Sequence, residues 1–194
     1  MTNLTLETMM TLEEFIRRYD EEGPFEILDG EIVVTMATIA GHGNTTDNLV
    51  WVLNQHIRPA QLGRTYFETP YVLSYDSQWV KGSRIPDVMF FAADRLATYQ
   101  AGDPDWQNKP LVLIPDLAVE IVSPNDKFTE VNSKVKLYLQ DGVKLVWIID
   151  PQLREIMIYT PNSQQTTILT ADDRLSGGNV LPDFEVAVAN LFKD

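Results

Sequence analysis

Apolar residues recur at helical spacing in three parts of the chain, and each part is bounded by residues that start or stop helices. The first part opens on Thr11-Leu-Glu-Glu14, which fits a capping box with Thr11 as N-cap and Glu14 reaching back. Gly23-Pro24 stops this helix. The other two helices are expected from about Asn44 to Ile57 and from Asn125 or Asp126 to about Gln140.

Shorter apolar runs bounded by Gly, Pro, Asp or Ser predict strands. Asp29-Gly30 lies between two such runs, residues 25–28 and 31–34, and indicates a two-residue hairpin. The run 145–149 is continuously apolar, which is typical of a central strand covered on both faces. Further strands are expected at about residues 64–68, 71–75, 84–91 and 117–122, with a peripheral hairpin at 155–159 and 166–169.

The order of these elements predicts an α/β domain with a mixed sheet whose centre is flanked by two helices. Residues 94–109 are expected to form a surface loop or helical turn, and the tail from Pro182 to Phe192 is expected to close with a short helix. Nothing marks a domain boundary, so a single domain over residues 1–194 is expected.

The composition indicates the cellular compartment of the protein and the kinds of partner it can bind. The 194 residues include no Cys, which favours a reducing compartment and excludes thiolate metal sites. No apolar run is long enough to span a membrane and the first ten residues do not resemble a signal peptide, so a cytoplasmic location is expected. The formal net charge of −13 counts against tight, non-specific DNA binding, but it does not exclude a nuclease whose clustered carboxylates hold Mg²⁺.

Two acids interrupt otherwise apolar strands, Asp87 in residues 85–91 and Glu120 in residues 117–122. A single acid of this kind most often ends a strand, forms a salt bridge and caps nearby backbone. Two of them on neighbouring strands favour a site instead, because a buried carboxylate must be paired, hydrogen-bonded or bound to a cation. The following helix carries Lys134 and Lys136 on opposite edges of its apolar stripe, and periodicity alone does not choose between them.

At these residues the chain resembles the PD-(D/E)XK nuclease superfamily, in which an Asp after Pro is followed by an acid and a Lys two residues apart. Pro86-Asp87 and Glu120-Ile121-Val122 fit this pattern, with Val122 in the place of the strand lysine. The substitution is that of the Uma-type restriction endonuclease family, in which the following helix supplies the lysine. The resemblance covers about residues 10–190 through several further fragments in the same order: residues 11–15, 25–31, His42-Gly43, 120–124, Lys134 with Tyr138, and 146–151.

The resemblance implies a restriction-endonuclease-like fold with an added N-terminal helix and hairpin, and a Mg²⁺- or Mn²⁺-dependent endonuclease that hydrolyses phosphodiester bonds of nucleic acid, DNA above all. Asp87, Glu120 and the carbonyl of Ile121 would hold the metal, and the family selects Lys134 as the catalytic lysine. A homodimer would offer two sites for double-strand cleavage, although the sequence does not itself show one.

Two residues outside this set have weaker claims. Glu26 could be an outer-shell partner of the metal site. The equal alternative is that it belongs to the turn chemistry and solvated strand face of the early hairpin. His42 could contact substrate, but a lone His beside a helix start is more often a helix-end residue. The alternative function is a nuclease fold kept as a binding or scaffolding module with weak or no catalysis, which the acidic charge and the missing strand lysine favour.

Overall fold

The computed structural model describes residues 9–35, 39–163 and 165–193. Its contacts divide the chain into two compact units. The first takes the described part of residues 1–37 together with 68–85 and 99–114, and the second takes residues 38–67, 86–98 and 115–194 where they are described. Each unit has its own core, and the expectation of a single domain over residues 1–194 stays a prediction.

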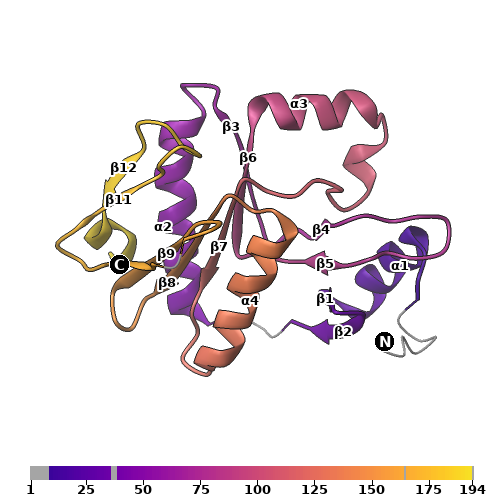
Figure 1. The fold of residues 1–194 in the computed structure, drawn as a ribbon, viewed down its shortest axis with the longest axis horizontal. Coiled ribbons are helices and arrows are strands. Elements are labelled where there is room, and N and C mark those ends of the chain that lie inside the picture. Colours follow the sequence, from indigo (N-terminus) through magenta and orange to yellow (C-terminus); the bar gives the residue numbers. More distant parts are fainter. Residues whose placement is uncertain (1–8, 36–38, 164, 194) are drawn as a thin grey trace. The chain divides into compact units, whose positions relative to one another are not determined.

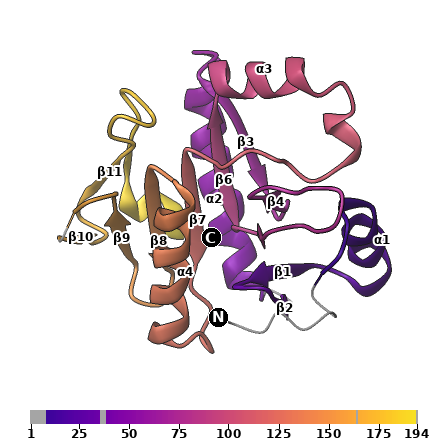
Figure 2. The same ribbon diagram turned by 45° about the vertical axis from the view of Figure 1, so that its right-hand side comes forward.

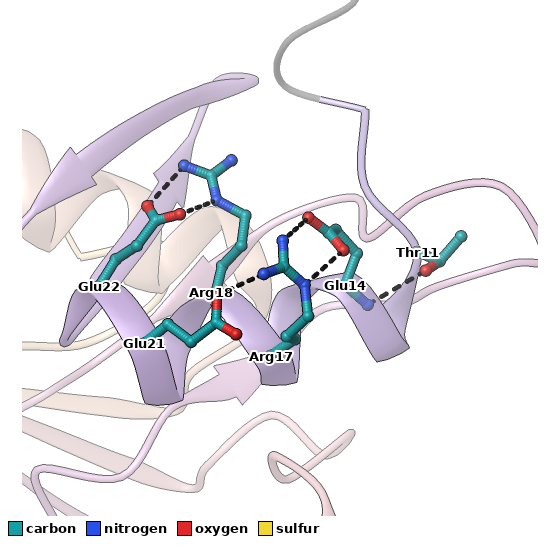
Figure 3. Close-up of polar contacts among 6 residues, drawn as sticks. All are labelled: Thr11, Glu14, Arg17, Arg18, Glu21 and Glu22. Carbon is teal, nitrogen blue, oxygen red and sulfur yellow. Dashed lines mark hydrogen bonds and ion pairs between the residues drawn. The ribbon is translucent and has the colours of Figure 1, made fainter.

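The first unit begins with helix α1 (Leu12–Glu22), whose N-terminus is capped as predicted. The hydroxyl of Thr11 accepts a hydrogen bond from the backbone N–H of Glu14 at 3.2 Å (Figure 3). The other half of the predicted capping box is wrong, because the Glu14 carboxylate binds the guanidinium of Arg17 instead of reaching back (Figure 3). This exposed i, i+3 pair competes successfully with the backbone of the cap.

Within the described residues, four strands form the sheet of the first unit in the order β2-β1-β5-β4. They are β1 (Phe25–Leu28), β2 (Glu31–Val34), β4 (Tyr71–Val72) and β5 (Ser83–Arg84). The predicted hairpin is confirmed: β1 and β2 pair antiparallel, and Asp29 and Gly30 have φ of 50° and 84°, as a type I′ turn requires. One face of this sheet packs on α1 through Phe15, Phe25 and Ile27.

The second unit contains the larger sheet, which has six strands in the described part of the chain, ordered β10-β9-β8-β7-β6-β3. The strands are β3 (Gly63–Phe67), β6 (Val88–Ala92), β7 (Leu117–Ile121), β8 (Leu145–Asp150), β9 (Glu155–Tyr159) and β10 (Thr167–Leu169). Only β7 and β8 pair in parallel, so among these described strands the sheet is mixed. β8 is buried over its first five residues, which confirms it as a central strand, and β9 and β10 form the predicted hairpin at the edge.

Helices α2 (Ala40–Ile57) and α4 (Phe128–Asp141) cover opposite faces of this sheet (Figures 1 and 2). Leu117, Val119 and Ile121 point to the face where the buried stripe of α2 packs. Side chains alternate along a strand, so Glu120 points to the other face, and there it meets α4. The α/β class with a central mixed sheet flanked by helices is therefore confirmed.

Several predicted boundaries are wrong. The strand expected at 84–91 is two strands, β5 and β6, in different sheets, because Pro86 lacks the N–H that a continuous ladder needs. The segment 94–109, expected as a surface loop or helical turn, contains α3 (Ala93–Gly102), a helix of ten residues of which only Leu96 is buried. The strand expected at 71–75 keeps only two residues as β4.

Two helix starts also differ from expectation. α2 begins at Ala40, four residues before the predicted start, since tertiary packing overrides the low helix propensity of Gly41 and Gly43. Neither Asn125 nor Asp126 caps α4, whose N-cap is Lys127, and the Asp126 carboxylate accepts the N–H of Ser123 instead.

The C-terminal segment forms a small hairpin, β11 (Arg174–Ser176) with β12 (Glu185–Ala187), which the sequence did not predict. The predicted short helix follows as a 3-10 helix, η3 (Val188–Phe192). Across the residues that the structure describes, no helix combines the length and the apolar character needed to cross a bilayer.

Candidate functional site

Asp87 directly precedes β6, and Glu120 lies in β7, the antiparallel neighbour of β6 in the second unit. In the antiparallel pairing of β6 and β7, Val88 is the partner of Val119. Asp87 directly precedes Val88, and Glu120 directly follows Val119, so the two acids lie next to each other along the sheet. Their partners come from different helices: Asp87 contacts His42 of α2, and Glu120 contacts Lys134 of α4. The fold thus brings together two acids that are 33 positions apart in the chain.

The Asp87 carboxylate is held at the end of β6 by contacts to β7 and α2. Its Oδ2 accepts the backbone N–H of Ile121 at 2.6 Å. The same oxygen lies 3.1 Å from Nε2 of His42, a side chain that is only 5% exposed. Asp87 itself is 18% exposed, so it is partly desolvated and fixed in position.

Glu120 is held from α4. Lys134 Nζ donates to Glu120 Oε2 at 2.7 Å, and the hydroxyl of Tyr138 donates to Oε1. Lys134 and Tyr138 are one helical turn apart, which places both over the same carboxylate. Lys136 is exposed. The geometry therefore resolves which of the two lysines reaches the acid, a choice that periodicity alone left open.

In the sequence, Tyr138 belongs to the family pattern but has no predicted role in the site. The structure adds it to the site, because it is fully buried and shares Glu120 with Lys134. The signal in the sequence was the spacing of four between a lysine and a tyrosine on one helix edge. That signal becomes specific only once the helix is docked on β7.

His42 and Glu26 lie in different units. His42 is within the first turn of α2 rather than before the helix, and it contacts Asp87. Glu26 belongs to the first unit, where it is buried and its Oε1 accepts the N–H of Ile85 at 2.9 Å. Burial of Glu26 contradicts the solvated strand face considered as its alternative. Its suggested outer-shell role stays a prediction. His56, in the last turn of α2, lies with its Nε2 2.8 Å from the carbonyl oxygen of Pro182.

A second buried acid, Asp116, shows what a purely structural carboxylate looks like in this unit. It also follows a proline, and it lies at the opposite end of β7 from Glu120. Arg95 Nη1 and Lys144 Nζ lie 2.8 and 2.7 Å from its oxygens, and Oδ2 accepts the N–H of Ala92. Burial raises the pKa of Asp116, but these hydrogen bonds and cations outweigh it and lower the pKa overall.

The pair formed by Asp87 and Glu120 differs from Asp116 in its balance of charge. The contacts described for Asp87 and Glu120 include one lysine, so these side chains together carry a net negative charge when His42 is neutral. Oxygen donors with surplus negative charge fit a hard cation such as Mg²⁺. No group of three or more Asp, Glu, His or Cys residues converges on a metal position in the described part of the chain. Two acids suit Mg²⁺, which keeps several waters and is often bound by one or two carboxylates plus substrate phosphates.

A solved structure has the same fold. It is a nuclease of DUF820 from Anabaena variabilis ATCC 29413, titled "putative", and it aligns with a TM-score of 0.75 at 23% sequence identity over 94% of this chain and 97% of that one. At this identity the likeness shows the fold. No curated protein matches the chain. The model of the Uma2 family, described as "Putative restriction endonuclease", matches residues 12–189, and the chain therefore belongs to that family.

Proposed function

We propose that this protein is a metal-dependent endonuclease that hydrolyses phosphodiester bonds of DNA, with Asp87, Glu120 and Lys134 as its catalytic residues. The observation that carries the proposal is the placement of two acids on neighbouring segments of the sheet, Asp87 directly before β6 and Glu120 in β7, with Lys134 bound to Glu120. Membership of a family described as restriction endonucleases and a nuclease with the same fold support it.

Asp87, Glu120 and the backbone carbonyl of Ile121 would hold one Mg²⁺ or Mn²⁺. When bound, such an ion acidifies a water molecule and offsets the charge that develops on the scissile phosphate. The N–H of Ile121 is already bonded to Asp87 Oδ2, so this peptide and this carboxylate are fixed relative to each other. Preorganisation of this kind reduces the entropy lost when the ligands converge on a cation.

Lys134 supplies a fixed positive charge beside Glu120. Its ammonium group would orient the attacking water or stabilise negative charge on the phosphate, from a helix rather than from the strand. Tyr138 holds the other oxygen of Glu120, and His42 holds Asp87. These two side chains keep the carboxylates aligned while substrate enters, a positioning role that involves no proton transfer to substrate.

The test is a calorimetric titration of Mn²⁺ into the wild type and the Asp87→Ala variant, followed by DNA cleavage under the same conditions. The control is Asp172→Ala, which removes an equal charge from an exposed turn. Loss of Asp87 should weaken Mn²⁺ binding at least about tenfold, or 1.4 kcal/mol, and abolish cleavage. Asp172→Ala should behave as the wild type.

Other results lead elsewhere. Mn²⁺ binding without cleavage would support the metal site and contradict the DNA substrate tested. Failure of the wild type to bind Mn²⁺, both alone and with a short DNA duplex present, would favour the binding or scaffolding module. In that case Asp87→Ala would leave partner binding intact.

A further inference from the structure

The outward face of α2 carries a stripe of exposed side chains that the site does not use. Asp47, Trp51, Gln55 and Arg58 are exposed at helical spacing. The buried stripe of the same helix, Leu49, Leu53 and Ile57, faces the core of the second unit. Together with Val50, Asn54 and Pro59, the exposed side chains line a shallow depression. Trp51 is 61% exposed within it.

Hydrogen bonds on both flanks of the helix hold this stripe in place. On one side Asn48 Nδ2 donates to the carbonyls of Leu191 and Lys193, and His56 contacts the carbonyl of Pro182. On the other side the hydroxyl of Thr65 in β3 donates to Asn54 Oδ1. A helix that these hydrogen bonds already hold in place loses little conformational entropy when its exposed face binds a partner.

The stripe is complementary to itself. Its only acid, Asp47, and its only base, Arg58, stand at opposite ends about three helical turns and 16 Å apart. A two-fold axis across the middle of the helix, between Val52 and Leu53, reverses the direction of a second copy. Asp47 of each copy then faces Arg58 of the other, giving two ion pairs from one contact. The same operation sets Trp51 against Asn54 of the second copy.

We propose that this chain forms a homodimer in which the two α2 helices pack antiparallel through Asp47, Trp51 and Arg58. Exposed tryptophan and arginine are the side chains most often found at the energetic centre of interfaces. The charge pattern favours a second copy over nucleic acid, since a chain of net charge −13 repels phosphate while this local patch attracts its own image. This dimer is independent of the proposed nuclease activity. The experiment that tests it measures the molecular mass of the protein in solution.

The experiment is sedimentation equilibrium of the intact chain over a range of concentrations. The wild type should approach twice the 22.0 kDa chain mass. Arg58→Glu and Asp47→Lys should each raise the dimer dissociation constant by about tenfold or more, because symmetry turns two attractive pairs into two repulsive ones. The double variant D47K/R58E restores opposite charges at both positions and should return the dissociation constant to within about threefold of wild type. Trp51→Ala leaves the net charge unchanged and should also weaken the dimer.

Lys136→Glu is the matched control for charge, since it removes one exposed base and adds one acid on the surface of α4, as Arg58→Glu does on α2. It should leave the dimer intact. Thermal unfolding of each variant establishes that it is folded. A wild-type mass of 22.0 kDa at every concentration would overturn the proposal. Single variants that weaken the dimer without rescue in the double variant would overturn the antiparallel register. If the protein stays monomeric and Arg58→Glu loses DNA binding, the partner of this surface is nucleic acid and the dimer proposal is overturned.

Discussion

Two buried carboxylates of the second unit, Asp116 and Glu120, differ in the side chains that contact them. Asp116 contacts two cations and accepts a backbone N–H. Glu120 accepts from Lys134 and from the hydroxyl of Tyr138. Burying either acid without these contacts would cost several kcal/mol. The two ends of β7 therefore differ in the side chains that hold their acids.

Tyr138→Phe tests the hold on Glu120. The change removes one hydroxyl whose proton is donated to a buried carboxylate, so the free energy of unfolding should fall by about 2 kcal/mol. Urea unfolding followed by tryptophan fluorescence measures it. Tyr159→Phe is the matched control, because its hydroxyl meets only the sulfur of Met157 at 3.7 Å and its loss should cost far less. Equal costs for the two variants would mean that the contact to Glu120 adds nothing to stability.

At the scale of elements, helix α4 positions Lys134 and Tyr138 beside Glu120. Val135 and Tyr138 are its buried residues, and they fix the helix over the sheet so that Lys134 reaches Glu120. Phe128 has nearly the same helical phase as the buried Val135, seven residues later, yet it is 75% exposed. Helical phase alone therefore overestimates how much of this stripe the sheet covers. The C-terminus of α4 is closed by Gly142 in the left-handed region, with φ of 106°.

Gly142→Ala should destabilise the protein by about 1 kcal/mol. A Cβ at Gly142 would meet no atom within 4 Å, so the cost comes from backbone conformation rather than from crowding. Gly102→Ala at the end of α3 has the same open space without positive φ, and it should be neutral or stabilising. Thermal unfolding of both variants measures the difference. If both alanines behaved alike, the left-handed cap would carry no energetic weight.

At the scale of the whole molecule, the excess of 28 acids over 15 bases makes pH a global control of stability. Most acids are exposed and gain little from folding. Asp116 is different, because its oxygens meet Arg95 and Lys144 and its pKa is lowered in the folded chain. A carboxyl whose folded pKa lies below its unfolded pKa stabilises the protein above the unfolded value, near 3.9, and this contribution is lost as pH falls through the folded pKa.

Asp116→Asn should therefore lower the free energy of unfolding by about 2 kcal/mol at pH 7. The wild type should lose this advantage as the pH is lowered below about 4. Urea unfolding from pH 7 to pH 3 measures both effects. Asp172→Asn, in an exposed turn, is the control and should leave the free energy of unfolding and its pH dependence nearly unchanged. A constant difference between Asp116→Asn and wild type over the whole range would show that the ionised form of Asp116 is not what stabilises the fold.

The sequence by itself determined the elements whose signals are local. The cap at Thr11, the stop at Gly23, the Asp29-Gly30 turn and the apolar run of β8 depend on neighbouring residues, so they could be predicted from sequence and are present in the structure. The anomalous acids Asp87 and Glu120 were also visible, because a charge within an apolar strand is unusual wherever that strand lies.

Tertiary structure decided everything that depends on register and docking. The break at Pro86, the helix at 93–102 and the early start of α2 follow from which sheet or face each segment joins, and no local pattern contains that information. The selection of Lys134 over Lys136 and the recruitment of Tyr138 and His42 are of the same kind. A helix displays side chains all round its axis, and only packing against a partner determines which of them reach a given carboxylate.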